Sequence, residues 1–132
     1  MKKQGILQGE ISKIIAESAH TDLIMIGDAG MPVPEGVKFI DLAVKEGVPG
    51  FLDVLEKVLE ELYIEEAVID VELKDLNPDY RKKILSLIDE KVPVKEIPHE
   101  DLKKMSKSCI AAIRTGEFTP YSNIILKSGV VF

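Results

Sequence analysis

Apolar residues recur along the chain with the spacing of helices in some segments and as short continuous runs in others. The helical spacing predicts an amphipathic helix that ends near Ser18 and a second helix over about 51–62. Asn77 followed by Pro78 predicts a third helix start, because Asn caps free backbone amides and Pro suits the first turn. A fourth helix is expected to open at 98–101 and to run through Met105.

The short apolar runs predict buried strands between these helices. They cover residues 23–26, 37–42, 67–71, 94–97, 110–113 and 123–126. Strands that alternate with helices are typical of an α/β layered domain with a mostly parallel central sheet flanked by helices. A length of 132 residues fits one domain with a buried core, which we expect to span 1–132.

The charge balance favours a neutral small molecule as the ligand. Seventeen basic and twenty-three acidic residues give a net charge of −6, whereas nucleic acid and anionic membrane surfaces require a basic footprint. No apolar run approaches the roughly 20 residues that cross a bilayer, and the N-terminus lacks the apolar core of a signal peptide. We therefore expect a cytoplasmic protein with neither nucleic acid nor membrane as a partner.

The sequence gives no support for a metal or a nucleotide cofactor. Cys109 is the single cysteine, and it precedes an apolar run, so we interpret it as a buried structural residue. The two histidines do not form an HxxxH or HxH motif, and no DxDxDG calcium loop is present. The phosphate-binding patterns GxGxxG and GxxxxGK[ST] are also absent.

Two polar segments stand out as candidate chemistry. The segment 113–126 places turn-forming and hydrogen-bonding residues between two apolar runs, as expected of a site for a polyhydroxylated small molecule. The second segment begins with His20-Thr21-Asp22 and continues, after a predicted strand, at 28–34. Ligands gather beyond the carboxyl ends of strands in open α/β sheets, and Asp28 and Arg114 each follow such an end. The sequence therefore predicts one site built from both segments.

Histidine is the natural proton shuttle of such a site, because its charge changes near neutral pH. We interpret His20 as a candidate acid–base group and Asp28 as the carboxylate that orients it or binds a hydroxyl. Asp28 has a structural alternative, since it suits a turn that satisfies the amides of the following loop. His99 follows Pro98 at a predicted helix start, so helix capping or simple exposure is an adequate explanation for it.

The C-terminal segment offers further candidates. Arg114 is either a structural fork to a carboxylate or a substrate contact. Tyr121 is expected at the rim of the site, where its ring packs against a sugar face. Asn123 supplies both a donor and an acceptor, which vicinal hydroxyls need.

Taken together, these motifs resemble the D-ribose pyranase family, which is related to the L-fucose mutarotases. The matching motifs are His-Thr-Asp at 20–22, Asp-Ala-Gly-Met-Pro-Val-Pro at 28–34, Pro-His-Glu at 98–100, Arg-Thr-Gly-Glu at 114–117 and Thr-Pro-Tyr-Ser-Asn at 119–123. The resemblance runs from Lys2 to Phe132. Ala19 and Gln8 depart from the Gly and Asn that the family usually has.

The resemblance implies an isomerase that interconverts the β-pyranose and β-furanose forms of D-ribose without a cofactor. It places the acting histidine on His20 and the sugar contacts on Asp28, His99, Tyr121, Ser122 and Asn123. It also implies a homo-oligomer, commonly a decamer of two stacked pentamers, with active sites completed across subunit contacts. The apolar residues 130–132 are interpreted as a tail tucked into the protein.

Two alternatives stay open from the sequence. The first is a mutarotase for another sugar such as fucose, because pocket depth depends on loops that the pattern does not place. The second is a non-catalytic sugar-binding accessory protein of a ribose transporter, which needs the same pocket but no proton shuttle.

Overall fold

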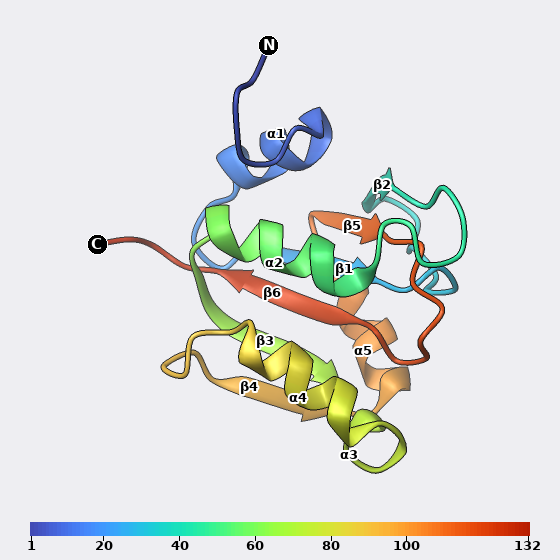
Figure 1. Cartoon of the computed structure of the whole chain (residues 1–132). Helices are drawn as coiled ribbons and strands as arrows, with labels where there is room; N and C mark the ends of the chain where they lie inside the picture. Colours follow the sequence, from blue (N-terminus) through green and yellow to red (C-terminus); the bar gives the residue numbers. More distant parts are fainter.

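The computed structural model describes all residues from Met1 to Phe132 and contains one six-stranded sheet. The strands are β1 (Leu23–Gly27), β2 (Lys38–Asp41), β3 (Ile64–Asp70), β4 (Val94–Ile97), β5 (Ala111–Arg114) and β6 (Ile124–Ser128). Their order across the sheet is β2-β5-β1-β6-β3-β4 (Figure 1). Strand β6 pairs antiparallel with both β1 and β3, and every other pairing is parallel. The predicted α/β fold with a mostly parallel sheet is therefore confirmed.

The helices begin where the sequence supplies caps. They are α1 (Gly9–Glu17), α2 (Phe51–Glu61), α3 (Leu73–Leu76), α4 (Pro78–Ser86) and α5 (His99–Met105), followed by the 3₁₀ turn η1 (Ser106–Ser108). Gln8 caps α1, because its side-chain oxygen accepts from the amide of Ile11 at 2.7 Å. It thus serves as the N-cap in place of the Asn that is usual in the family. Asn77 accepts from the amide of Tyr80 at 3.3 Å and caps α4 as predicted. Only the single-turn elements α3 and η1 were not anticipated.

Alternate residues of each strand face two separate apolar layers. Ile24, Ile26 and Ile69 belong to a large cluster that includes residues of α1, α2 and α4. Met25 and Val68, one position along, belong to a smaller cluster with Leu102 of α5 and the buried thiol-bearing Cys109. Helices thus cover both faces of the sheet (Figure 1), and the structural role predicted for Cys109 is confirmed.

Strands β1 to β5 all run in one direction across the sheet. We call the side of the sheet where these strands end the carboxyl edge, and the side where they begin the amino edge. Because β6 runs the other way, Asn123 precedes it at the carboxyl edge and the C-terminal residues leave it at the amino edge. The loops over 42–50 and 115–123 lie at the carboxyl edge, where the loop that follows β1 also begins (Figure 1). The fold therefore brings the residues that follow β1 and β2 together with the residues that precede β6 at the carboxyl edge.

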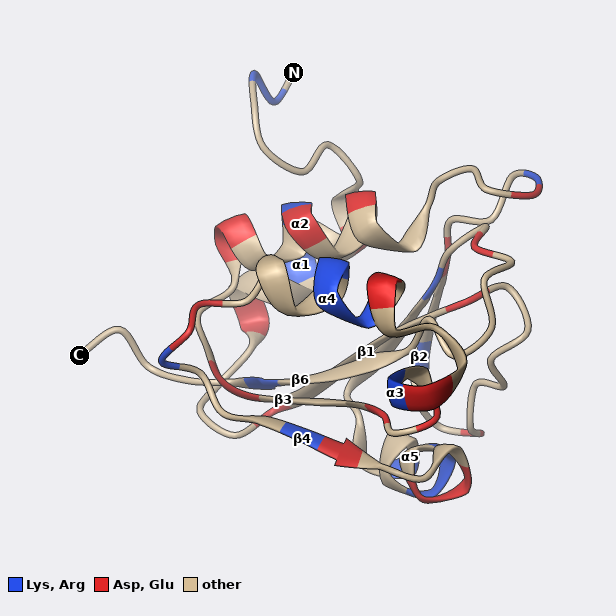
Figure 2. Ribbon diagram, turned by 60° about the horizontal axis from the view of Figure 1, so that its bottom comes forward, with Lys and Arg blue, Asp and Glu red and all other residues tan.

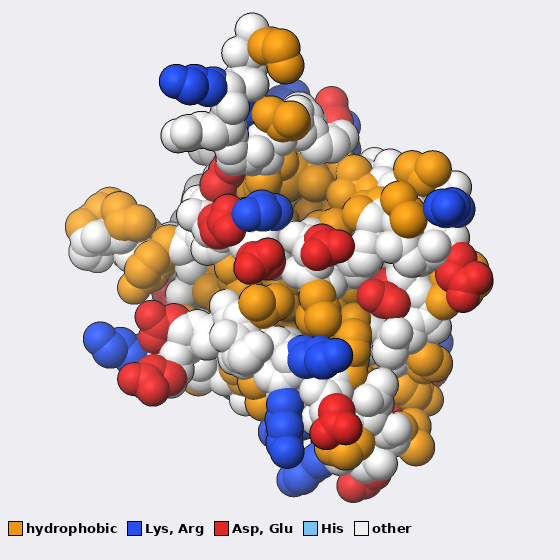
Figure 3. All heavy atoms as spheres, in the orientation of Figure 1, with side chains coloured by type: hydrophobic (Ala, Val, Ile, Leu, Met, Phe, Trp, Pro, Cys, Tyr) orange, Lys and Arg blue, Asp and Glu red, His pale blue; other side chains and the backbone are white.

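The interpretation of 130–132 as a tucked tail is wrong for the single chain. Pairing of β6 with β3 ends at Ile64 and Ser128, and the last backbone hydrogen bond of the tail is that of the Gly129 amide to the carbonyl of Tyr63, at 2.9 Å. Beyond this point no strand is left to pair with, and Phe132 is fully exposed. The tail projects from the body with apolar side chains outward (Figure 3).

The surface carries both signs of charge, with acidic residues in excess. Figure 2 shows lysines and arginines interspersed with aspartates and glutamates over the helices and β4. None of the helices is long and apolar enough to span a membrane.

Candidate active site

Two carboxylates from neighbouring parts of the carboxyl edge are joined by one amide. Asn123 donates from Nδ2 to Asp70 Oδ2 at 2.9 Å and, more weakly, to Asp28 Oδ2 at 3.4 Å. Its Oδ1 accepts from the backbone amide of Asp28 at 3.1 Å. Asp70 is the last residue of β3, and Asp28 follows β1. The amide between them keeps two acidic groups together without direct contact.

His99 lies against this pair and is oriented by Asp70. Its Nδ1 is 3.1 Å from Asp70 Oδ1, and its backbone amide donates to the carboxylate of Glu72 at 3.0 Å. The ring meets Tyr121 edge-on, with centroids 5.4 Å apart. When Asp70 is ionised its carboxylate accepts but cannot donate, so Nδ1 then carries the hydrogen of this bond, and Nε2 makes no hydrogen bond within the chain. His99 is therefore a held imidazole rather than a merely exposed helix start.

Burial acts on both carboxyl groups of the cluster. The side chain of Asp70 has no exposed surface, and this burial raises its pKa above the ordinary value, against the hydrogen bonds from Asn123 and His99. Burial likewise raises the pKa of Asp28, opposed by hydrogen bonds from the Gly30 amide and from Asn123. Perturbed carboxyl groups of this kind cluster at functional sites. The bond to Gly30, at 3.0 Å, shows that the turn role considered for Asp28 is also real.

The side chains of Ser122 and Asn123 are fully buried and already bonded within the chain. Ser122 donates to the carbonyl of Thr119 at 2.7 Å, and Asn123 is occupied by the two carboxylates. In contrast, the backbone amides of Tyr121, Ser122 and Asn123 donate to no group of the chain. Tyr121 has a φ of 65°, a left-handed conformation that is costly for a side chain of its size. Because Ser122 and Asn123 have no exposed surface, Tyr121, which is partly exposed, is the residue of this segment that can meet a ligand.

Much of the remaining polarity of 113–126 holds the loop itself. Thr115 donates to the carbonyl of Gly27 at 2.8 Å. Glu117 accepts from the amide of Phe51 at 3.2 Å and from the hydroxyls of Thr119 and Tyr80. Burial raises the pKa of the Glu117 carboxyl, but these bonds outweigh burial and leave it below its ordinary value.

Arg114 forms a structural fork to a carboxylate, which was one of its two interpretations from the sequence. Its Nε donates to Asp41 Oδ1 at 3.0 Å, its Nη2 binds the other oxygen, and its guanidinium lies 5.2 Å from the centroid of the Phe39 ring. The pair ends the adjacent strands β2 and β5 and is partly exposed. A neighbouring cavity of about 530 Å³ is lined by the 29–37 loop together with Phe39 and Arg114.

His20 does not lie in this cluster, which corrects the prediction that Asp28 orients it. His20 precedes β1 and Asp28 follows it, so the strand separates them by roughly 20 Å at about 3.3 Å per residue. His20 instead contacts Glu65 at the start of β3, with Nε2 to Oε2 at 2.8 Å. Asp22, two residues after His20, accepts from the amide of Ala19 at 2.8 Å. The single site predicted from both segments thus divides between the two edges of one chain.

Sequence reasoning missed Asp70 and Glu65. A signal for Asp70 was available, because an aspartate within the apolar run 67–71 demands a buried partner. Glu65 gave no such signal, since it is one of two consecutive glutamates that look like a polar connection. No group of three or more His, Cys, Asp or Glu side chains is arranged to hold a metal ion.

Comparisons with known proteins agree over the whole length of the chain. The sequence pattern of the RbsD / FucU transport protein family matches residues 1–131. The chain is 52% identical to a D-ribose pyranase of Thermoanaerobacter sp. and 48% identical to a D-ribose pyranase of Coprothermobacter proteolyticus, each over 132 residues that cover all of both proteins.

Solved structures give the same result. The structure of Bacillus subtilis RbsD complexed with D-ribose superposes with a TM-score of 0.94 at 45% identity, covering both chains completely. A fucose mutarotase from Streptococcus pneumoniae, in complex with L-fucose, superposes with a TM-score of 0.74 at 26% identity, covering 96% of this chain and 95% of that one. The full-length match, and not one motif, carries the conclusion: this chain belongs to the RbsD / FucU transport protein family.

Proposed function

We propose that this protein is a D-ribose pyranase, an isomerase that interconverts the β-pyranose and β-furanose forms of D-ribose without a cofactor, with residues 1–132 as one catalytic domain. The observation that carries the proposal is the held imidazole of His99 at the carboxyl edge, whose Nε2 makes no hydrogen bond within the chain and whose ring lies beside that of Tyr121. Relatives at 48–52% identity that are D-ribose pyranases support the choice of ribose.

The separation of His20 from this edge implies that the working site uses two subunits. If the amino edge of one subunit faces the carboxyl edge of the next, His20 reaches the neighbour's cluster of Asp28, Asp70, His99 and Asn123. A contact that joins two different surfaces of identical chains closes into a ring when the rotation permits. We therefore propose a ring-shaped homo-oligomer, in line with the decamer of stacked pentamers expected from the family resemblance.

The sugar would be held by groups that the chain leaves available. The partly exposed ring of Tyr121 offers a flat apolar surface for a sugar face. Asp28, about half-buried, accepts hydrogen bonds from hydroxyl groups. Ser122 and Asn123 are fully buried and would contribute as scaffold, and Asn123 would fix Asp28 for this task.

Ring opening and closing then need two proton-transfer groups. His20 of the neighbouring subunit donates a proton to the ring oxygen as the bond between that oxygen and the anomeric carbon breaks. The Nε2 of His99 takes the proton of the anomeric hydroxyl, which becomes the aldehyde. For reclosure the hydroxyl on carbon 4 attacks the aldehyde and gives its proton to His20, while His99 returns its proton to the new anomeric oxygen. Both imidazoles end in their starting states.

The exchange can be measured directly by saturation-transfer NMR between the two ring forms of ribose. His20→Ala should reduce the catalysed exchange by about 10²–10⁴-fold, the usual worth of a positioned acid–base group. A parent protein that does not accelerate the exchange would refute the proposal, and a His20→Ala variant that exchanges ribose as fast as an active parent would show that His20 is not the catalyst. A panel that includes L-fucose tests the mutarotase alternative, and binding with unchanged exchange would favour the accessory protein.

Mixing two inactive variants tests the shared site. When His20→Ala and His99→Ala subunits are co-assembled in equal amounts, about one quarter of the head-to-tail contacts hold both intact histidines. Exchange activity should therefore return to about one quarter of the parent value. Activity that stays absent in verified mixed assemblies would mean that both histidines must come from one chain.

The cytoplasmic location stays a prediction.

A further inference from the structure

His20 is the first of three side chains that are linked by polar contacts on the amino edge. Its Nε2 lies 2.8 Å from Glu65 Oε2, and the other oxygen of Glu65, Oε1, lies 3.1 Å from Lys127 Nζ. Glu65 belongs to β3 and Lys127 to β6, while His20 stands just before β1. Both oxygens of one carboxylate are therefore used, one by the histidine and one by the lysine.

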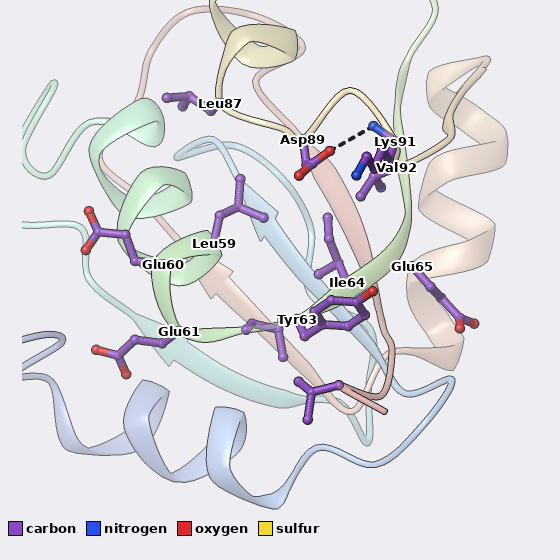
Figure 4. Close-up of a pocket in the computed structure, with 12 residues that line it drawn as sticks. Leu59, Glu60, Glu61, Tyr63, Ile64, Glu65, Leu87, Asp89, Lys91 and Val92 are labelled. Carbon is purple, nitrogen blue, oxygen red and sulfur yellow. Dashed lines mark hydrogen bonds between the residues drawn. The ribbon is translucent and has the colours of Figure 1, made fainter.

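The surroundings fix Glu65 in this role. In Figure 4 the Glu65 side chain stands at the margin of a cavity of about 670 Å³ and points away from its apolar residues Leu59 and Ile64. The hydrogen bonds from His20 and then from Lys127 hold the pKa of the Glu65 carboxyl below its ordinary value. An ionised carboxylate accepts only, so the hydrogen of the His20–Glu65 bond lies on Nε2.

The backbone of His20 is fixed as well. The amide of Thr21 donates to the carbonyl of Ser128 at 2.8 Å, and Thr21 adopts a φ of 73°. Asp22, the remaining charged group of this turn, is engaged by the amide of Ala19. The imidazole is thus held at Nε2 and at its backbone, while Nδ1 makes no hydrogen bond within the chain.

We propose that Glu65 is the positioning residue of His20, and that Nδ1 of His20 is the nitrogen that exchanges a proton with the sugar. This inference rests on the proposed function. Glu65 holds the hydrogen on Nε2 throughout the cycle, so the protonated ring loses its proton from Nδ1 to the ring oxygen. The neutral ring then has a lone pair on Nδ1, which takes the proton of the attacking hydroxyl. Lys127 keeps Glu65 in place.

The chain provides a closely matched control. Glu66 is the next residue and pairs with Lys95 at 2.9 Å, without contact to a histidine. Glu65→Gln and Glu66→Gln therefore make the same chemical change at adjacent positions. Only the first touches the imidazole.

The test combines kinetics with a spectroscopic signature on the assembled protein. Magic-angle-spinning ¹⁵N NMR with ring-labelled histidine reports the tautomer of each imidazole, and two histidines make assignment simple with His20→Ala. Glu65→Gln should mix the tautomers of His20, leave those of His99 unchanged, and lower kcat for ribose exchange by about tenfold or more with KM within about twofold. Glu66→Gln should match the parent in every measurement.

The outcomes separate this inference from the function on which it rests. If the parent does not accelerate exchange, the proposed function fails; if His20→Ala keeps the full exchange of an active parent, the role of His20 fails whatever Glu65 does. If His20→Ala is inactive but Glu65→Gln keeps the parent's kcat, or keeps a single Nε2–H tautomer of His20, the assignment of Glu65 is overturned. A rise in KM with unchanged kcat also overturns it, because a positioning residue acts on the proton-transfer step.

Discussion

Asp70 and His99 form a pair in which a carboxylate with no exposed surface lies 3.1 Å from the imidazole Nδ1. A buried carboxylate is costly unless it is bonded on several sides, and Asp70 meets this need with His99 and with the amide of Asn123. The pair mirrors that of His20 with Glu65 on the other edge. Each chain thus carries two carboxylate-held histidines, one on each edge of the sheet.

Replacing Asp70 by Asn should uncouple His99 from its carboxylate while keeping the size of the side chain. We expect kcat for ribose exchange to fall by about tenfold or more, because Nδ1 no longer faces an acceptor of fixed charge. The matched control is Glu72→Gln, which changes the carboxylate that holds only the backbone amide of His99. Equal kcat for Asp70→Asn and Glu72→Gln in the saturation-transfer assay would remove His99 from the proton-transfer step.

Asn123→Asp should destabilise the fold in a pH-dependent way. The new carboxylate would be buried between Asp28 and Asp70, whose pKa values are already raised by burial, and a buried unpaired charge costs about 3–5 kcal/mol. A carboxyl group whose pKa is higher in the folded than in the unfolded state lowers the free energy of unfolding as the pH rises above its unfolded pKa of about 3.9. The loss in the free energy of unfolding should therefore be larger at pH 7 than at pH 4.

Urea denaturation at the two pH values, at fixed protein concentration, measures this difference. Asn77→Asp is the control, because an aspartate caps α4 as well as the asparagine does and should change stability little at pH 7. A loss for Asn123→Asp that does not grow between pH 4 and pH 7 would contradict the buried-charge explanation.

Gly116→Ala should disturb the loop that carries the candidate site. A Cβ atom there would stand 2.5 Å from the carbonyl oxygen of Lys45 and 2.6 Å from that of Val48, and backbone atoms cannot turn aside. We expect a loss of about 1–3 kcal/mol in unfolding free energy together with reduced exchange. Gly9→Ala, at the start of α1, meets nothing within 4 Å and should be neutral or slightly stabilising. Thermal denaturation of the two variants provides the comparison.

Cys109 should resist alkylation while the protein is folded. Burial raises the pKa of its thiol to about 12, so about one molecule in ten thousand carries the reactive thiolate at pH 8. Intact-mass measurement after treatment with iodoacetamide should show labelling at least about 100-fold slower than in guanidinium chloride. Rapid labelling of the folded protein would mean that the α5 face opens frequently.

The sequence predicted the elements well because each strand and helix depends on nearby residues. All six strands and four of the helices lie within a few residues of their predicted bounds. Strand β3 begins at Ile64 rather than Ala67, because Glu65 and Glu66 are polar and look like a connection. The four residues of α3 form a single turn, which is too short for helical spacing to be recognised.

The direction of β6 and the partners of the two histidines could not be predicted from local patterns. Strand direction depends on pairing with β1 and β3, which lie about 100 and 60 residues earlier in the chain. Glu65 is 45 residues from His20, and Asp70 is 29 residues from His99. The prediction that Asp28 orients His20 failed because it treated both ends of β1 as one location.

The reversed course of β6 has a practical meaning for attaching labels and anchors. Phe132 emerges on the same side as His20, Glu65 and Lys127, whereas Met1 leaves the molecule beyond α1 (Figure 1). A fusion partner joined to Phe132 would crowd the surface that is expected to meet the next subunit. Attachment through Met1 is therefore the design choice for immobilised or tagged forms of this protein.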